Sequence, residues 1–405
     1  MNSRLFVQSD CFQVLKKAEG EAWLSCKIPG KPTLYGSLKC VAVGSDGVPE
    51  ITASEGFLVK EVTKKSILVS CPEENASSKF VAPYTTFSRV HHKSITCLDI
   101  SSGGGLGVST STDGTMKIWQ TNNGEPRRIL EGHVYDVNCC RFFPSGLVVL
   151  SGGMDAQVKI WSAEDGSCPV TLKGHKGGIL DVAIVDRGRN VVSSSRDGTA
   201  RLWDCGKSAC LAEVANCGSP VNGIALGNAD NTINLGSPEE APSEREIGTE
   251  GKLLLLARED GKLQGASLQS RQHVFIYAGS DAMNCCAFLS SVHVLAGSQD
   301  GNIYRLDLRN PSTPVNTVHL SGAPVLSLVP FREGYAVSQG DGSCFIIQQD
   351  MDHIIELVGA DCDPIYKVAC SEKLVYTCCR DGIIRKYQLS DLWTLLTYKP
   401  TMGGK

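Results

Sequence analysis

Serine, histidine and aspartate occur together three times in this chain, and a tryptophan follows each time. The three sets are His91, Ser109, Asp113, Trp119; His133, Ser151, Asp155, Trp161; and His175, Ser193, Asp197, Trp203. A serine activated by histidine and oriented by aspartate is the nucleophile of many hydrolases. A hydrolase needs one such triad, whereas this set returns every 42 residues with identical internal gaps. We therefore interpret these residues as structural hydrogen-bonding groups and predict that the protein is not an enzyme.

The spacing indicates a repeated β-structured unit. Each tryptophan ends a short apolar run, MKIW, VKIW or ARLW, that follows an Asp-Gly or Asp-Ala turn suited to a hairpin. A period of about 40–45 residues, with Gly-His near its start and Trp-Asp near its end, is typical of a four-stranded propeller blade. The segments EGH…SGGMDAQVKIW and KGH…SSSRDGTARLWD resemble the WD40 family. The resemblance implies that each aspartate lies in the turn between the second and third strands.

The aspartate of this pattern returns four more times, at Asp260, Asp300, Asp341 and Asp381. Seven such positions predict an all-β fold, a seven-bladed WD40 β-propeller. In the four later copies the tryptophan is replaced by Ala266, Leu306, Ile347 and Tyr387, and only His319 keeps the histidine spacing. We expect apolar packing to hold these blades where the hydrogen-bonding residues are missing.

Residues outside the repeat divide the rest of the chain. Residues 1–84 contain strand-like runs separated by turns, which predicts a small β-rich N-terminal domain. The propeller then spans residues 85–392, and residues 393–405 form a C-terminal tail. Two segments compete for the outer strand that closes the ring, Thr85–Val90 and Trp393–Tyr398, and the register of the first favours it. Closure removes the open sheet edge of an unclosed ring.

Asp197 and Asp260 are 63 residues apart, which is 21 residues more than the period of 42. Because Val221 keeps the register of Ile179, the insertion lies at about residues 229–249 and includes SPEEAPSEREIGTE. Its prolines and glutamates predict a solvated, mobile loop on the face opposite the Asp turns. The loop is interpreted either as an insertion without a role or as an acidic segment that recruits a basic partner.

Composition excludes several classes of function. The net charge of −4 gives no basic footprint for nucleic acid. No apolar stretch approaches the ~18–20 residues that span a membrane, and the N-terminus lacks a signal-peptide core. These features predict a protein of the cytoplasm or the nucleus that does not enter a membrane, and we expect a monomer when it is free.

Eighteen cysteines could indicate disulfides or metal sites. They are spread along the chain without a C-x-x-C pair, often as doublets such as Cys139–Cys140, Cys285–Cys286 and Cys378–Cys379. Neighbouring strand residues point to opposite faces, so a doublet cannot share a metal. We therefore expect reduced, buried thiols and no metal. Phosphate-binding loops and metalloprotease motifs are also missing from the sequence, so no cofactor is expected.

Longer stretches resemble one family more specifically. VYDVNCCRFFPSGLVVLSGGMDAQVKIWSAEDGSC, ENASSKFVAPYTTFSRV and YTCCRDGIIRKYQLSDL are similar to the proteasomal ATPase-associated factor family, assembly chaperones of the proteasome regulatory particle. The resemblance reaches from near the N-terminus to about Leu392, and the tail departs from it. It implies that the protein binds the C-terminal domain of an ATPase subunit of the 19S base and delays its docking onto the 20S core.

Propeller geometry supplies candidate contact residues. The loops before each first strand and the Asp turns converge on one face, which would present Tyr135, Asp136, Glu259, Asp281, Asp361, Asp363 and Tyr366. The cations predicted beside them are Lys93, Lys176, Arg196 and Arg380. The acidic group is a candidate patch for basic side chains of the ATPase domain. Solvated loop charges without a role are the alternative.

A second class of function is also open, a substrate receptor of a cullin-type ubiquitin ligase. The motif of that class is Trp-Asp-x-Arg at the end of a third strand. The nearest matches are Leu306-Asp307-Leu308-Arg309, which lacks the tryptophan, and Trp203-Asp204-Cys205-Gly206, which lacks the arginine.

Overall fold

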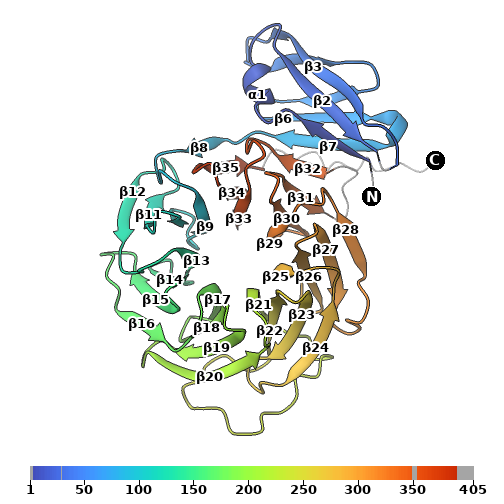
Figure 1. Cartoon of the computed structure of the whole chain (residues 1–405). Helices are drawn as coiled ribbons and strands as arrows, with labels where there is room; N and C mark the ends of the chain where they lie inside the picture. The colour runs from blue at the N-terminus through green and yellow to red at the C-terminus, as the bar shows by residue number, and fades with distance from the viewer. Residues whose placement is uncertain (1–2, 29, 349–353, 390–405) are drawn as a thin grey trace, which may run out of the picture.

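The computed structural model describes residues 3–28, 30–348 and 354–389. These residues form an almost wholly β structure with one short helix, α1 (Cys11–Val14), and a 3-10 turn, η1 (Pro72–Glu74). Seven sheets stand around a ring, and a smaller β unit lies outside it (Figure 1). The prediction of a propeller preceded by a small β-rich unit is therefore confirmed.

Each blade is an antiparallel sheet of four strands in sequence order from the ring axis outwards, except where the N-terminal strands join. The innermost strands are β9 (Ile95–Ile100), β13 (Val137–Phe142), β17 (Ile179–Val185), β21 (Val221–Asn228), β25 (Met283–Phe288), β29 (Val325–Phe331) and β33 (Ile365–Ser371). The second strands are β10 (Leu106–Ser111), β14 (Val148–Gly153), β18 (Asn190–Ser195), β22 (Lys252–Arg258), β26 (His293–Ser298), β30 (Gly334–Gln339) and β34 (Leu374–Cys379).

The two outer positions complete the blades. The third strands are β11 (Met116–Gln120), β15 (Gln157–Ser162), β19 (Thr199–Asp204), β23 (Lys262–Ser267), β27 (Asn302–Asp307), β31 (Cys344–Gln348) and β35 (Ile384–Gln388). The outermost strands are β12 (Pro126–Leu130), β16 (Val170–Lys173), β20 (Ala209–Asn216), β24 (His273–Ala278), β28 (Asn316–His319), β32 (Ile354–Leu357) and β8 (Thr85–Phe87). Blades 1 to 7 are numbered from β9 to β33.

The three tryptophans fill the spaces between blades. Trp161 of blade 2 packs among residues of blade 1, Trp203 packs against blade 2, and Trp119 packs against blade 7. Each ring is at most 1% exposed. In the Gly-His pairs, Gly132 and Gly174 have φ values of 146° and 154°, and a Cβ there would lie 3.2 Å from the tryptophan ring. Glycine is therefore required before each of these histidines.

Polar side chains of the innermost strands join neighbouring blades. Asn138 donates to the Ile179 carbonyl at 2.6 Å, and Asn284 donates to the Val325 carbonyl at 3.2 Å. The carboxylate of Asp181 accepts the backbone N–H of Ile224 at 3.1 Å. These bonds satisfy buried polar groups while fixing the spacing of the ring.

The ring closes with an N-terminal strand. β8 pairs antiparallel with β35 and becomes the outermost strand of blade 7. Ser94 also donates to the Arg380 carbonyl at 2.7 Å and links blade 7 to blade 1. The competing segment Trp393–Tyr398 lies outside the described residues.

The N-terminal unit is joined to blade 6 by backbone pairing. One sheet contains β1 (Arg4–Val7), β2 (Glu21–Lys27), β3 (Leu34–Val43) and β4 (Pro49–Ala53). The other strands, β5 (Leu58–Val62), β6 (Ser66–Cys71) and β7 (Ala76–Val81), extend blade 6 into a seven-stranded sheet, because β7 pairs parallel with β32. Figure 1 shows this unit seated outside the ring beside β32 and β8.

Arg4 reinforces the junction between the N-terminal unit and blade 6. Its guanidinium lies between the rings of Phe6 and Phe345, 4.2 and 4.1 Å from their centroids. It also donates to the Leu320 carbonyl at 3.1 Å and contacts Glu356 at 3.5 Å. The Arg4 side chain is only 6% exposed. Its contacts join residues that are more than 300 positions apart in the sequence.

The insertion connects β21 to β22 and projects beyond the blades at the bottom of Figure 1. Both of its ends are anchored to the ring, and the prediction of a mobile loop stays a prediction. Ser270 donates to the Leu235 carbonyl at 2.5 Å. Arg245 forms an ion pair with the buried Asp204 at 3.1 Å, and the Ile247 N–H donates to Asn190 at 2.7 Å. Residues 236–244 between these anchors are exposed.

Candidate binding face

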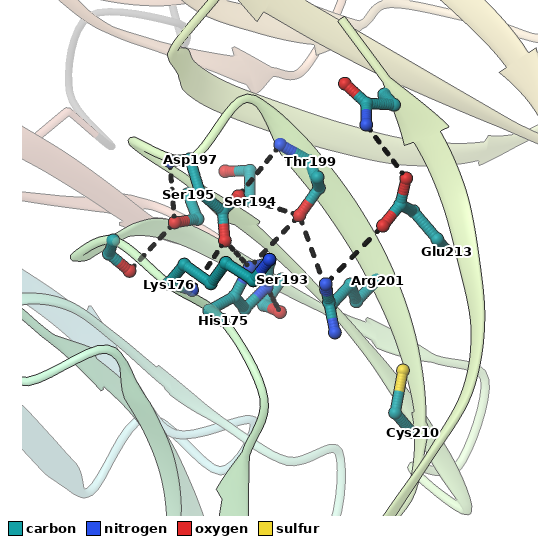
Figure 2. Close-up of polar contacts among 12 residues, drawn as sticks. His175, Lys176, Ser193, Ser194, Ser195, Asp197, Thr199, Arg201, Cys210 and Glu213 are labelled. Atoms are coloured by element: carbon teal, nitrogen blue, oxygen red, sulfur yellow. Dashed lines mark hydrogen bonds and ion pairs between the residues drawn. The ribbon is translucent and has the colours of Figure 1, made fainter. Parts of the chain in front are cut away.

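In blade 3 the four motif residues form one chain of hydrogen bonds. Trp203 Nε1 donates to Ser193 Oγ at 2.8 Å, and Ser193 Oγ lies 2.8 Å from His175 Nε2. His175 Nδ1 lies 2.9 Å from Asp197 Oδ2, as Figure 2 shows. Because the tryptophan N–H donates to the serine oxygen, the serine hydroxyl donates to Nε2, and the Nδ1–H donates to the carboxylate.

The carboxylate at the end of this chain positions a surface loop. Asp197 accepts the backbone N–H groups of Lys176 at 2.8 Å and Thr199 at 2.9 Å. Lys176 belongs to the loop before β17, whereas Thr199 starts β19. The relay therefore ties the Asp turn to the loop that precedes the innermost strand.

Blade 2 repeats the relay, and blade 1 modifies it. His133 contacts Asp155 at 2.9 Å and Ser151 at 2.7 Å, while Trp161 donates to Ser151 at 2.8 Å. Asp155 also accepts the Val134 N–H at 3.3 Å.

In blade 1, His91 contacts Ser109 at 2.8 Å, and Trp119 donates to Ser109 at 3.1 Å. The other ring nitrogen of His91 lies 3.2 Å from the Thr115 hydroxyl, which in turn donates to Asp113 at 2.5 Å. The expected link between histidine and aspartate therefore passes through a threonine in this blade.

Burial keeps the relay histidines neutral near pH 7. It lowers the pKa of His91 to about 4, and the nearby Lys117 ammonium acts in the same direction. Burial also lowers the pKa values of His133 and His175, although their aspartates oppose the shift. Partial burial disfavours the charged form of Asp197, but hydrogen bonds from Lys176 and Thr199 outweigh it and hold its pKa well below the usual range.

This arrangement does not fit nucleophilic catalysis. Ser109, Ser151 and Ser193 are fully buried, and each hydroxyl is held between a histidine and a tryptophan. A serine nucleophile must reach a substrate carbonyl. The geometry therefore supports a structural role for the relays.

Blades 4 and 7 hold their Asp turns with arginine. Arg258 bonds to Asp260 at 2.7 Å and to the Cys217 carbonyl, in the loop before β21, at 3.0 Å. Arg385 likewise bonds to Asp381 and to the Gly359 carbonyl, which precedes β33, at 2.7 Å. The expectation that apolar packing alone replaces the relay is therefore wrong for these blades.

Blades 5 and 6 use smaller polar groups for the same connection. In blade 5, Ser280 before β25 donates to Asp300, and His319 contacts Asn302 at 2.9 Å. In blade 6, Gln339 donates to the Ala323 carbonyl, before β29, at 3.0 Å. His319 therefore forms its hydrogen bond within blade 5. The spacing had predicted a relay with Asp341 of blade 6, and His319 does not reach that residue.

These connections arrange one face of the ring, here called the Asp-turn face, which carries the Asp turns and the loops before the innermost strands. Its most exposed apolar group lies on blade 2, beside blade 1. Val134 is 74% exposed, Tyr135 63% and Met154 36%. With Lys93 and Asp136 they border an open depression of about 530 Å³. We call these five residues the blade 1–2 patch.

The relay of blade 2 holds this patch in place. Asp155 accepts the Val134 N–H, and the Met154 N–H donates to the Asp136 carbonyl at 2.8 Å. The exposed side chains therefore project from backbone that these hydrogen bonds hold in place. Sequence reasoning named Tyr135 and Asp136 but missed Val134 and Met154, although an apolar residue after each of His133 and Gly153 was a usable signal.

The predicted acidic residues are contributed by several blades. Asp136, Glu259, Asp281 and Asp361 are exposed, and they come from loops before or within four different blades. Asn222 donates to Glu259 at 2.6 Å. Asp363 is engaged by Arg380, which bonds to it at 2.8 Å, so this carboxylate is partly neutralised.

Tyr366 departs furthest from the expectation. It lies in β33, is half-buried, and lines the central cavity of the ring. The predicted cations Lys93, Lys176 and Arg196 are exposed. The Asp-turn face is therefore mixed in charge.

The central cavity has a volume of about 480 Å³ and is lined by all seven innermost strands. Four charged groups line it: Asp99, Arg141, Asp181 and Lys367. Arg141 contacts Asp181 at 3.4 Å, and Asp99 accepts the Phe142 N–H at 2.7 Å. Sequence reasoning did not find this cluster, because its members are contributed by four blades.

In the part of the chain that the structure describes, no three or more His, Cys, Asp or Glu side chains are arranged to hold a metal ion. Over the same residues, no helix has the length and apolar character to cross a membrane.

Comparisons with known proteins agree with the fold. The family model described as "WD domain, G-beta repeat" matches residues 83–120, 124–162 and 166–204. These ranges contain the three His–Ser–Trp relays and the three inner strands of blades 1 to 3.

Close relatives extend the similarity over the rest of the chain. "Proteasomal ATPase-associated factor 1" of Gallus gallus and that of Homo sapiens are each 74% identical over 392 residues, which is 97% of this chain and 100% of theirs. "Probable proteasomal ATPase-associated factor 1" of Dictyostelium discoideum is 36% identical over 94% of this chain and 95% of its own.

Proposed function

The chain belongs to the proteasomal ATPase-associated factor 1 family, and we propose that it is a non-catalytic platform that binds a proteasomal ATPase subunit. In this proposal it engages the C-terminal domain of an ATPase of the 19S base. Occupying that domain delays the association of the subunit with the 20S core, so the protein acts as an assembly chaperone. The observation that carries the proposal is the 74% identity over 97% of the chain.

The blade 1–2 patch supports a protein partner. Its exposed residues include a tyrosine, a methionine and a valine beside one acidic and one basic side chain. Tyrosine and methionine are enriched in the buried centres of interfaces, and a few such anchors carry most of the binding free energy. The patch also stands on a rigid support, which reduces the entropy lost on binding.

The exposed carboxylates supply the second part of the proposed interface. Asp136 lies within the patch, whereas Asp361 lies in the loop before β33, next to blade 1 around the ring. Charges at the border of an interface act chiefly on the association rate and on its salt dependence. Basic side chains of the ATPase domain would complement them.

The first test is affinity purification of the tagged full chain from cell extract at moderate salt, with identification of the partners by mass spectrometry. We expect one or two proteasomal ATPases without the proteolytic core. Recovery of a ubiquitin-ligase adaptor in place of any ATPase would overturn the proposal and favour the substrate-receptor alternative. In the ligase-type motif Leu306-Asp307-Leu308-Arg309, the Arg309 side chain forms an ion pair with Asp307 at 2.6 Å.

Variants then locate the interface. Tyr135→Ala is expected to weaken ATPase binding by about tenfold or more, the size of a typical hot-spot loss. Tyr84→Ala is the matched control, because Tyr84 is 58% exposed but lies at the base of the N-terminal unit. Equal binding by both variants and the parent would exclude the patch while leaving the partner itself unaffected.

Charge reversal tests the acidic contribution. Asp136→Lys combined with Asp361→Lys is expected to slow association several-fold at low salt and to flatten its dependence on ionic strength. Unchanged rates at both low and high salt would remove these carboxylates from the interface.

The chaperone part of the proposal has its own readout. Purified 20S core and ATPase subunits are mixed with and without the protein, and their association is followed by native gel electrophoresis. We expect slower association in its presence and no stable complex containing this protein and the finished particle. A stoichiometric place in active proteasomes would contradict the proposal.

A further inference from the structure

The central cavity of the ring contains two cationic side chains with unused hydrogen-bond donors. Arg141 of β13 lines the cavity and is 38% exposed, and it contacts Asp181 through one terminal nitrogen at 3.4 Å. That distance is longer than the ~2.7–2.9 Å of a strong charge-assisted hydrogen bond. Lys367 of β33 lines the same cavity, and among the described residues its ammonium has no hydrogen bond or ion pair. Both cations therefore retain N–H groups for further acceptors.

The two carboxylates of the cavity already accept hydrogen bonds from the backbone. Asp181 accepts the N–H groups of Val182 at 2.9 Å and Ile224 at 3.1 Å. Asp99 accepts the N–H of Phe142 at 2.7 Å. The hydrogen-bonding capacity that the cavity leaves unused is therefore mainly that of donors, which suits an anionic guest better than a cationic one.

Small side chains leave room beside the cations. Counted from the start of each innermost strand, the position of Arg141 in β13 is occupied by alanine in four other strands: Ala183, Ala225, Ala287 and Ala369. The resulting cavity of about 480 Å³ lies within the roughly 300–1,000 Å³ that is usual for small-molecule sites. Its lining residues do not overlap the blade 1–2 patch.

Both cations stay charged at neutral pH. Burial opposes the charge of Lys367, but the Asp181 carboxylate outweighs it and raises the pKa of the ammonium. The Arg141 guanidinium acts in the opposite direction on the pKa of Lys367, so the two cations lie near enough to repel each other. Burial raises the pKa of Asp99, which weakens a competing negative charge. An anion bound between Arg141 and Lys367 would relieve their repulsion.

We infer that the central cavity binds a small organic polyanion, a molecule with two or more carboxylate or phosphate groups. Arg141 and Lys367 donate to its oxygens from blades 2 and 7, which lie on either side of blade 1. A guanidinium can donate two parallel hydrogen bonds to one carboxylate or phosphate group, and an ammonium supplies a point charge for the second group. This site lies outside the proposed ATPase interface and goes beyond the proposed function.

The test uses citrate for the carboxylate class and inorganic pyrophosphate for the phosphate class. The purified full chain is melted at increasing concentrations of each probe, with sodium chloride holding the ionic strength constant. A ligand of the folded state raises the melting temperature as its concentration grows. We expect this rise with at least one probe, and binding of one equivalent by titration calorimetry. No rise with either probe up to millimolar concentrations would overturn the inference.

A variant locates the bound probe. Lys367→Met removes one cation, keeps an apolar stem of similar length, and is expected to weaken binding by about tenfold, the value of one charge-assisted hydrogen bond. Lys176→Met is the matched control, because Lys176 is exposed on the Asp-turn face. Equal affinities of the two variants would place the probe outside the cavity and contradict the inference.

A second measurement on the parent protein does not depend on the folding of a variant. Lysines are acetylated with acetic anhydride in the presence and absence of the probe, and the products are mapped by mass spectrometry. We expect the probe to protect Lys367 and to leave the labelling of Lys176 unchanged. Equal labelling of Lys367 in both samples would overturn the inference, and no labelling in either would do so by showing that the cavity is closed to small molecules.

Discussion

Blades 1–3 and blades 4–7 solve one structural problem with different chemistry. Every blade must tie its turn between the second and third strands to the loop before its innermost strand. Blades 2 and 3 do so with a neutral histidine and an aspartate, and blade 1 adds a threonine. Blades 4 and 7 use an arginine that spans the turn and a loop carbonyl, and blades 5 and 6 use serine and glutamine.

The difference teaches that the connection matters more than the residue types that make it. A buried relay needs a histidine, a serine, an aspartate and a tryptophan in fixed geometry. An arginine reaches both groups with one side chain, and its aspartate stays partly solvated, as Asp260 at 30% exposure shows. Substitutions in the first half of the ring should therefore cost more than equivalent ones in the second half.

The largest difference is expected at the tryptophan position. Trp203→Ala should lower the free energy of unfolding by about 3–5 kcal/mol, the usual cost of a large cavity. The corresponding position of blade 4 already holds alanine, Ala266, with 1% exposure. Chemical denaturation checks this result, with Ile129→Ala as a control because Ile129 is 52% exposed. Equal losses in the two variants would mean that blade 3 does not depend on its tryptophan.

The second largest difference in the free energy of unfolding is expected when a buried serine hydroxyl is removed from each half of the ring. Ser193→Ala leaves His175 and the Trp203 N–H without their shared partner, at about 1–3 kcal/mol for each buried group. Ser338→Ala in blade 6 is the comparison, at the position that Ser194 holds in blade 3, next to Ser193. The Ser338 side chain is fully buried, and its hydroxyl has no hydrogen-bond partner among the described residues.

We therefore expect Ser338→Ala to be neutral or slightly stabilising. Thermal melting of both variants beside the parent gives the comparison. A larger loss from Ser338→Ala than from Ser193→Ala would break the distinction between the two halves.

Lowering the pH should destabilise blades 1–3, which contain the relay histidines, before it destabilises blades 4–7. The pKa of His91 is lowered to about 4 by burial, whereas an unfolded histidine titrates near 6.5. Between these values the unfolded chain binds more protons, so stability falls as the pH decreases from about 6.5 towards 4. The contribution of His91 amounts to about 2 kcal/mol by pH 5.

Urea unfolding at pH 7, 6 and 5 measures this slope. His91→Gln removes the titrating group and should flatten the slope relative to the parent, whatever its effect on stability at pH 7. An unchanged slope in the variant would show that the relay histidine is not the source.

The smallest effect is expected in blade 5. Asp300→Ala removes a carboxylate that accepts from Ser280, Ser298 and Asn302. The exposed Ser280 can bond to water instead, and the buried Ser298 keeps the Asn302 carbonyl as an acceptor at 3.0 Å. We expect a loss of about 1 kcal/mol, the typical net value of a hydrogen bond. Asp197→Ala in blade 3 is its counterpart and should cost more, because the His175 side chain that it leaves behind is buried. Hydrogen exchange of the loops before β25 and β17 would locate both effects.

Most of the ring was predictable because its signals are local. The turn aspartates, the apolar third strands and the spacing of 40 to 42 residues are properties of single blades, and they located all seven. The relay partners were also predictable, since histidine, serine and tryptophan of one relay come from one blade.

The missed features depend on contacts between distant segments. Arg258 and Arg385 are not members of the His–Ser–Trp set, so their role required the neighbouring loop carbonyls in space. The anchoring of the insertion of blade 4 required Asp204 and Asn190, which lie in strands of the neighbouring blade 3. Tyr366 was placed on the wrong surface because strand boundaries decide whether a residue faces the cavity or the loops.

The sequence by itself determined that the chain is a seven-bladed propeller and which residues hold its first three Asp turns. Both follow from periodicity, since hydrogen bonding and strand alternation within one blade act over short distances along the chain. Only the tertiary structure decided that the N-terminal unit continues blade 6 and that Val134 and Met154 join Tyr135 on one surface. These contacts join segments whose approach depends on ring closure, and no local pattern of residues records it.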